Sequence, residues 1–242
     1  MNFTKILSAL ATTTVLACAS AHAAPINLVT NGGFETTTKG VGQINSKTTA
    51  TGWTSAGYNF VFNGATADSI GAIGDYGVVK LWGPASGSNN GLGVSPTGGN
   101  FLAADGAFGV APITQMINGL VVGQSYDLSF YWAGAQQATY NGATTENWAA
   151  SLGAQTFTTA TYKNNSHGFS GWMQQTFTYT ATSTSELLSF LATGTPSGVP
   201  PFSLLDGVSL TARVPEPSSV ALLLAGLAML TVGARARRRS GK

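Results

Sequence analysis

Asp206 is the acidic residue whose surroundings most clearly point to chemistry, because it interrupts an apolar run. Phe202, Leu204, Val208 and Leu210 share its parity in the sequence. Alternate residues of a strand lie on one face, so Asp206 would point with these neighbours toward a core. A buried carboxylate without a partner is strongly unfavourable, so it needs a cation, a cluster of N–H donors or a proton. A bulge that turns Asp206 outward is the alternative.

Catalytic patterns are weak in this sequence. His167 is the only histidine after residue 23, it lies in a loop-like Asn/Ser/Gly segment, and no Gly-x-Ser-x-Gly motif accompanies it. A glycosidase needs two facing carboxylates, and nothing in the spacing pairs the candidates, which are Glu35, Asp105, Glu146 and Asp206. We expect no enzyme and no catalytic residues. A glycosidase that uses Glu35 or Glu146 is the less favoured alternative.

Flat aromatic side chains could bind sugars, because the C–H faces of a sugar stack on rings while its hydroxyls need polar partners. The aromatic residues outside clear core parity are Trp53, Tyr58, Trp82, Tyr140, Trp148 and Trp172. Of these, Trp82, Tyr140 and Trp148 are the candidates for stacking on a ligand. A place in the core is the alternative for each of them.

Charge and cysteine content exclude other classes. Charged residues make up 8% of the 242 residues, against about 25% in ordinary soluble domains. Residues 24–213 hold five basic and eight acidic residues, a net charge of −3, and no cysteine. This segment therefore offers no electrostatic footprint for nucleic acid. It also cannot form a disulfide framework or a Cys-ligated metal site.

Residues 1–23 have the pattern of a secretory signal peptide. Lys5 gives the charged start, residues 6–17 the apolar stretch, and Ala21-His22-Ala23 the cleavage site. About 12 apolar residues are too few to span a bilayer of roughly 30 Å. The alternative is a lipoprotein signal, in which Cys18 would be lipidated and become the new N-terminus.

Residues 214–242 have the pattern of a membrane tail. Val214-Pro215-Glu216-Pro217 is stiff, residues 218–234 form an uncharged span of 17 residues, and residues 235–242 carry five basic side chains. Such a span is at the lower limit for a transmembrane helix. By the positive-inside rule the C-terminus stays cytoplasmic and the body lies outside.

This order of Pro215-Glu216-Pro217, apolar span and Arg cluster resembles the PEP-CTERM sorting signal of Gram-negative bacteria that make exopolysaccharide. The resemblance implies processing near the motif by an exosortase, a membrane-embedded cysteine transpeptidase, with the three motif residues serving recognition. Its partners would be the exosortase and the export machinery. An inner-membrane-anchored precursor would then give a protein of the cell surface or extracellular matrix. An ordinary C-terminal anchor is the alternative.

Residues 24–213 contain short β-branched and aromatic runs broken by turn residues, without helical periodicity. Strands are expected at 58–62, 78–82, 113–117, 125–132, 148–157, 172–180, 187–192 and 202–211. This pattern favours one all-β domain, a single antiparallel jelly-roll-like β-sandwich. The Gly-rich stretches 64–77 and 83–99 are expected to be surface loops, either filler or a binding rim.

The body also resembles carbohydrate-binding modules built on the galactose-binding-like jelly roll. The similarity lies in the segment from Asn27 to Glu35 with Gly52-Trp53 downstream, the strand from Gly123 to Phe130, and the last strand from Leu204 to Leu210. It implies a structural Ca²⁺ bound by the Gly33 carbonyl, Glu35 and Asp206. These are three of the six to eight oxygens that calcium prefers.

Together these observations predict an exported, exosortase-sorted, non-catalytic surface or matrix protein that binds exopolysaccharide. A structural or adhesive matrix protein without a specific glycan ligand is the alternative.

Overall fold

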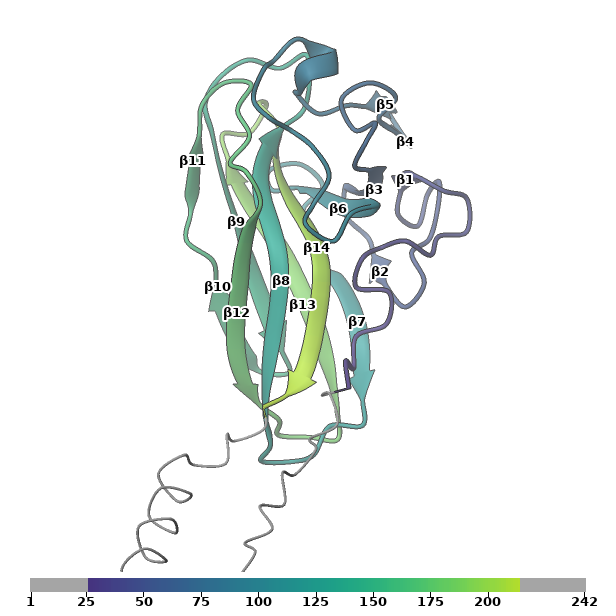
Figure 1. The fold of residues 1–242 in the computed structure, drawn as a ribbon, viewed down its shortest axis with the longest axis vertical. Helices are drawn as coiled ribbons and strands as arrows, with labels where there is room; N and C mark the ends of the chain where they lie inside the picture. Colours follow the sequence, from purple (N-terminus) through teal and green to yellow (C-terminus); the bar gives the residue numbers. More distant parts are fainter. Residues whose placement is uncertain (1–25, 214–242) are drawn as a thin grey trace, which may run out of the picture.

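The fold is an antiparallel β-sandwich (Figure 1), known from a computed structural model that describes residues 26–213. The first sheet has the order β1-β3-β6-β14-β8-β12, and every named pair in it is antiparallel. Its strands are β1 (Gly42–Gln43), β3 (Asn59–Asn63), β6 (Asn100–Asp105), β14 (Pro201–Ala212), β8 (Ser125–Gln136) and β12 (Met173–Thr180).

The second sheet faces the first and has the order β10-β9-β13-β7-β2, with β11 also paired to β9. Its strands are β10 (Gln155–Thr158), β9 (Thr144–Leu152), β13 (Ser185–Thr195), β7 (Ile113–Asn118), β2 (Thr54–Ser55) and β11 (Tyr162–Asn164). From β6 to β9, and again from β12 to β14, consecutive strands alternate between the two sheets. This winding confirms the predicted all-β, jelly-roll-like sandwich.

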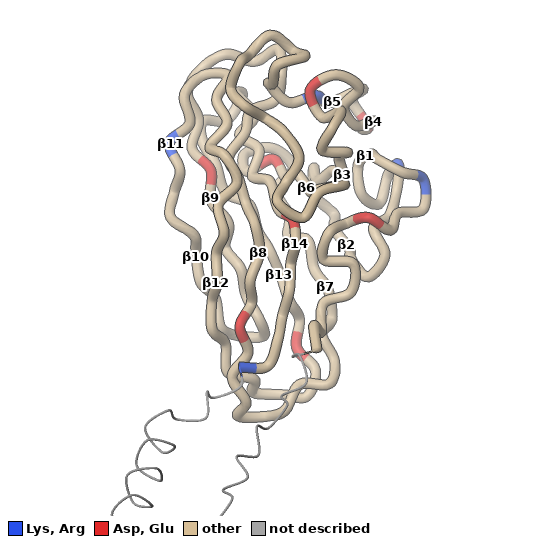
Figure 2. Tube along the Cα trace, in the orientation of Figure 1, with Lys and Arg blue, Asp and Glu red and all other residues tan. Residues whose placement is uncertain are grey.

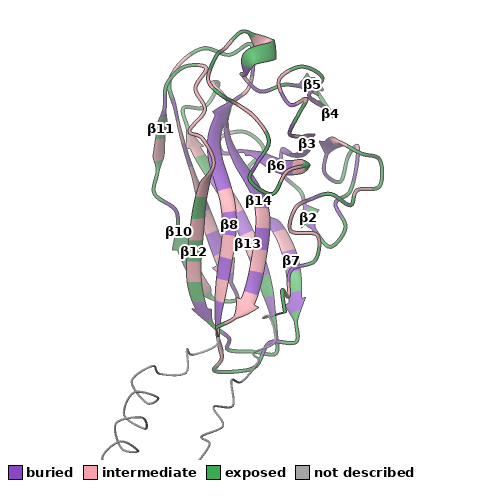
Figure 3. Cartoon of the chain, viewed as in Figure 1, coloured by how far each residue is buried: buried purple, intermediate pink, exposed green. Residues whose placement is uncertain are grey.

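Strand alternation builds the core between the sheets. In β8, Tyr126, Leu128, Phe130 and Trp132 are buried and the residues between them are half-buried (Figure 3). These side chains meet Trp148 of β9 and Phe190 of β13 from the second sheet. The parity expected for this strand is therefore confirmed.

A second core lies on the other face of the first sheet, where loops and a small hairpin cover it. The hairpin pairs β4 (Ala72–Gly74) with β5 (Gly77–Val79), and a 3₁₀ turn (Pro84–Ser86) follows. Ala72 and Val79 of the hairpin pack on β3, β6 and β14 through a cluster that includes Phe60, Phe62, Phe101, Phe202 and Leu204. The Gly-rich stretches thus contribute to a core as well as to the surface.

Two expected strand boundaries are wrong. Residues 148–157 form parts of two strands, β9 and β10, which turn at Gly153. Gly153 has a φ of 56°, a left-handed conformation that glycine adopts without steric cost. Residues 78–82 hold a strand only as far as Val79. The strand β6 was not expected, because its NFLAAD sequence carries little β-branched signal.

The parity proposed for the last strand holds only up to Asp206. A β-bulge interrupts β14 between Asp206 and Ser209, and Gly207 within it has a φ of 59°. Because a bulge adds one residue, it reverses which face the following residues occupy. Leu204 accordingly lies in the second core, while Val208 lies in the core between the sheets. Asp206 is fully buried, as expected, but not on the face of Val208 and Leu210.

The two ends of the sandwich are distinguished by which strands begin and finish there. We call the end where β8 begins and β14 finishes the foot, and the opposite end the head; both chain ends leave at the foot (Figure 1).

Charged residues are few along the described chain, as Figure 2 shows. No helix within residues 26–213 is long and apolar enough to cross a membrane. The expected signal peptide (1–23) and tail (214–242) lie outside the described residues.

Candidate functional site

The three residues expected to bind calcium come together beside the bulge of β14. A methyl group on Gly33 would lie 3.6 Å from Asp206 Oδ1 and 4.0 Å from Glu35 Oε1. Both carboxylates therefore face the same small space next to Gly33. Phe34, between Gly33 and Glu35, has a φ of 57° and is fully buried, so it anchors the turn that presents Glu35.

Asp206 has further partners that the sequence did not reveal. The hydroxyls of Ser95 and Thr97 both donate to its Oδ2, while Oδ1 is buried without a hydrogen-bond partner. Burial raises the pKa of Asp206 to about 6, with a smaller contribution from the charge of Glu35, although hydrogen bonds from Ser95, Thr97 and the Gly207 amide work to lower it. Glu35 Oε1 accepts a hydrogen bond from the Asn100 amide at 2.8 Å. Two carboxylates and two hydroxyls fit a hard cation, whose remaining oxygens would come from backbone or water.

The aromatic stacking candidates have different surroundings. Trp148 is fully buried between the sheets, where its Nε1 donates to Leu204 O at 3.0 Å, so its ring faces are closed to a ligand. Trp82 is half-buried, and one face of its indole is covered by the imidazole of His167, with ring centroids 3.9 Å apart. Tyr140 is exposed and is the only one of the three that lines a cavity.

That cavity, the head cavity, has a volume of about 340 Å³. Its walls come from the start of β3, the β4–β5 hairpin, the end of β6, and the loops that follow β8 and precede β14. Three aromatic rings form one wall: the centroid of Tyr58 is 5.1 Å from that of Phe108 and 6.0 Å from that of Tyr76. Tyr76 is 78% exposed and Phe108 51%. Tyr76 and Phe108 thus offer exposed ring surface beside a hollow, while Tyr58 is buried in the wall. Exposed rings at a hollow are the arrangement that sugar stacking needs.

Asp105, the last residue of β6, lies in the wall of this cavity and is 2% exposed. Its Oδ1 accepts hydrogen bonds from the backbone amides of Ala107 (2.8 Å) and Phe108 (3.1 Å), while Oδ2 is buried without a partner. Burial raises the pKa of Asp105 to about 6, although these two hydrogen bonds work to lower it. Burial, and next the charge of Asp105, also raise the pKa of Tyr58.

The sequence pointed to Asp105 only as one of four acidic residues, and Tyr76 and Phe108 were not singled out. Tyr76 lies in a Gly-rich stretch and Phe108 in a short loop, so neither belongs to a strand pattern. An aromatic residue inside a Gly-rich segment was the available signal, because such a segment has few apolar neighbours to bury the ring against.

Glu146 of β9 is a further buried acid, and it is not among the described residues that line the head cavity. It is fully buried, Thr144 Oγ1 donates to its Oε1, and Oε2 has no partner. Burial raises its pKa to about 8. No cluster of three or more His, Cys, Asp or Glu side chains able to hold a metal occurs within residues 26–213.

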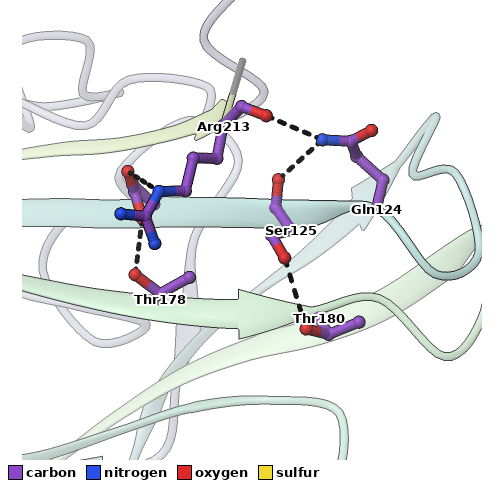
Figure 4. A network of polar contacts seen from close by, with 6 residues as sticks. Gln124, Ser125, Thr178, Thr180 and Arg213 are labelled. Carbon is purple, nitrogen blue, oxygen red and sulfur yellow. Dashed lines mark hydrogen bonds and ion pairs between the residues drawn. The ribbon is translucent and has the colours of Figure 1, made fainter. Parts of the chain in front are cut away.

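The foot holds the point where the tail begins. Arg213, the last described residue, donates its amide to Ser125 O at 2.8 Å and accepts a hydrogen bond from Gln124 Nε2 at 2.9 Å (Figure 4). Its guanidinium lies 3.9 Å from Asp127, which also accepts a hydrogen bond from Thr178. These contacts hold Arg213, the residue immediately before Val214, against the body.

A family model described as the PEP-CTERM protein-sorting motif matches residues 213–239. The chain carries a PEP-CTERM sorting signal. This confirms the resemblance drawn from Pro215, Glu216 and Pro217, which lie outside the described residues. The signal implies an exported, membrane-anchored precursor that an exosortase processes. No curated protein matches this sequence.

The solved structures that are similar to the body include several carbohydrate-binding modules. The module TmCBM61, in complex with β-1,4-galactotriose, is 16% identical with a TM-score of 0.39, covering 78% of this chain and 99% of its own. A CBM4 structure is 17% identical with a TM-score of 0.36, covering 76% and 99%. The CBM22-1 xylan-binding domain of Paenibacillus barcinonensis Xyn10C is 13% identical with a TM-score of 0.39, covering 79% and 97%.

Proposed function

We propose that this protein is a non-catalytic, exosortase-sorted protein of the cell surface or extracellular matrix that binds polysaccharide in the head cavity. The observation that carries the proposal is the wall formed by Tyr58, Tyr76 and Phe108 beside the polar side chains of Asp105 and Gln137. Exposed rings next to a few polar groups match what a sugar needs, since its C–H faces stack while its hydroxyls pair. We propose an exopolysaccharide as the glycan, because the sorting signal resembles that of bacteria that make exopolysaccharide.

The placement of the cavity relative to the tail supports this function. β14 runs through 12 residues from Pro201, beside the cavity, to Ala212 at the foot. At roughly 3.3 Å per residue this strand spans about 40 Å. A protein held at a membrane or surface through its C-terminus would therefore present the head cavity outward.

The non-catalytic part of the proposal rests on the functional groups around the cavity. Asp105 is the only carboxylate among the described residues that line it. A glycosidase of the usual kind needs two carboxylates on either side of the scissile bond. Glu35 and Asp206 do face each other, but Asn100, Ser95 and Thr97 already engage them.

We further propose that Glu35 and Asp206, with the Gly33 carbonyl, hold a structural calcium ion. The buried and unpartnered Oδ1 of Asp206 supports this, because a cation would satisfy it. The ion would neutralise two carboxylates that otherwise repel each other, and so would tie β14 to the N-terminal loop. The alternative is that the Ser95 and Thr97 hydroxyls and a nearby backbone amide suffice for Asp206.

Glycan binding is tested by screening the purified mature protein on a polysaccharide array, followed by calorimetry on the glycans that bind. Tyr76→Ala and Phe108→Ala should each weaken binding at least about ten-fold, as loss of a central aromatic contact does. Phe157→Ala is the matched control, because Phe157 of β10 is 41% exposed and lies outside the cavity. Self-assembly in the absence of any glycan, with no binding on the array, would favour the structural matrix protein instead.

A further inference from the structure

The head cavity has a chemical bias that goes beyond binding glycans in general. Among the described residues lining it, Asp105 is the only ionised side chain at neutral pH, and none is Lys or Arg. The carboxylate is buried, so solvent screens it poorly and its charge acts strongly on anything placed in the cavity. Asp75, which also acts on Tyr58, is paired with Lys47 at 3.0 Å and is partly exposed.

The hydrogen bonds of Asp105 compensate only one of its two carboxylate oxygens. Both backbone donors of the following turn, from Ala107 and Phe108, are used by Oδ1, which leaves Oδ2 as an acceptor without a donor. Oδ2 is enclosed, so a sugar in the cavity meets the negative charge of Asp105 rather than the oxygen atom itself. A uronate or sulfate group would bring a second negative charge beside this one, which no cationic side chain among the described lining residues offsets.

We infer that Asp105 is a specificity-determining residue that restricts the head cavity to non-acidic sugars and excludes uronates and sulfated sugars. This inference rests on the proposed function, since it requires that the cavity binds glycans. The aromatic wall supplies stacking that neutral and acidic sugars share equally. The carboxylate of Asp105 is therefore the group that discriminates between neutral and acidic sugars.

Asp105→Asn separates this role from a structural one. The asparagine Oδ1 can still accept the amides of Ala107 and Phe108, so the turn after β6 keeps its hydrogen bonds. Its Nδ2 replaces the unpartnered acceptor with a donor and removes the charge. Asp75→Asn is the control, because it removes an acidic side chain from the β4–β5 turn without touching the cavity wall.

The experiment measures calorimetric affinities of the full mature protein for matched oligosaccharides that differ only in oxidation of C6 to a carboxylate. At pH 7 the wild type and Asp75→Asn should bind the neutral form up to about ten-fold more tightly, because the pKa of Asp105 is about 6 and protonating it, the alternative to holding two like charges, costs about one pKa unit. This ratio should shrink as the pH falls below about 6, where Asp105 takes up a proton while the uronate stays charged. Asp105→Asn should bring the two forms within about two-fold, at an unchanged melting temperature within a few degrees.

Equal affinity of the wild type for both forms would overturn the inference while leaving glycan binding intact. Discrimination that survives in Asp105→Asn would overturn the assignment to Asp105. If Asp105→Asn does not fold, loss of discrimination in the wild type as the pH falls through about 6 supports the charge of Asp105, and discrimination that persists at pH 5 refutes it. Failure of the wild type to bind any glycan would refute the proposed function itself, a result distinct from the others.

Discussion

The carboxylate of Asp206 in β14 accepts a hydrogen bond from the hydroxyl of Ser95, 111 residues earlier in the chain. Ser95 lies in a Gly-rich stretch, and Asp206 lies in the last strand at its bulge. This contact joins the loop layer to the sandwich at the point where Glu35 also arrives. Several measurable consequences concern this region and the other buried acids.

Calcium should stabilise the wild-type protein. Added Ca²⁺ is expected to raise the melting temperature and EDTA to lower it, because an ion bound only by the folded state adds its binding free energy to stability. Glu35→Gln and Asp206→Asn should abolish the response, whereas Asp127→Asn at the foot should keep it. Since the pKa of Asp206 is about 6, protons should compete with the ion below that pH. Scanning calorimetry that shows no response to either reagent would rule out the site.

Glu146 should make the protein less stable in alkali. Its folded-state pKa is raised from 4.5 to about 8, so its contribution is fully present below pH 4.5 and is lost as the pH rises through 8. By pH 9 the loss approaches about 5 kcal/mol, since each pKa unit of the shift is worth roughly 1.4 kcal/mol. Glu146→Gln should therefore be more stable than the wild type at pH 9 and similar to it at pH 5. Denaturant unfolding at both pH values provides the measurement.

Glu186 serves as a control, because its contribution to stability should depend on pH in the opposite direction to that of Glu146. Burial acts to raise its pKa, but hydrogen bonds from the hydroxyl and amide of Thr182 and the amide of Ser183 together lower it. A lowered pKa contributes stability above the unfolded pKa and loses it as the pH falls. Glu186→Gln should thus be destabilised at pH 7, with the difference vanishing in acid. The same pH response in both Gln variants would contradict this account.

Substitution of Trp148 should mainly lower stability, whereas substitution of Tyr140 should mainly weaken glycan binding. Trp148→Ala removes a fully buried ring from the core between the sheets and should cost about 3–5 kcal/mol. Tyr140→Ala removes an exposed ring at the rim of the head cavity and should change stability by only about 0.5 kcal/mol. It should still weaken glycan binding. A stable Trp148→Ala that loses binding would reverse the roles given to these two residues.

The sorting signal predicts a processed C-terminus. Mass spectrometry of protein from the native host should show residues 1–23 removed and the chain ending near Pro215-Glu216-Pro217. Glu216→Gln should cause the uncut precursor to accumulate in the membrane fraction. The Arg213 contacts at the foot should be unaffected, because they precede the motif. An intact tail in mature material would contradict the sorting account.

The sequence predicted the strands best where the buried face alternates regularly, as in β8 and β13. It failed where one residue changes the pattern. Gly153 splits an expected strand into a hairpin, and the bulge at Gly207 moves Asp206 to the other face from Val208. Both are left-handed glycines, and the sequence does not indicate which of its 31 glycines adopt that conformation. The alternation of residues between the two faces of a strand can therefore be extrapolated only as far as the next such glycine.

The sequence by itself determined the C-terminal sorting signal and the all-β class of this protein, and the resemblance to carbohydrate-binding modules predicted the proximity of Glu35 and Asp206. Signals and strands are read from contiguous or periodic residues, so local order is sufficient to recognise them. Only the tertiary structure decided which aromatic rings remain exposed, because the head cavity joins Tyr76, Phe108 and Tyr140 from separate segments. It also decided that Asp105 lies beside them with its Oδ2 lacking a partner, while Trp148 is enclosed. Exposure and partnership depend on contacts between distant segments, and those contacts form only when the sheets close.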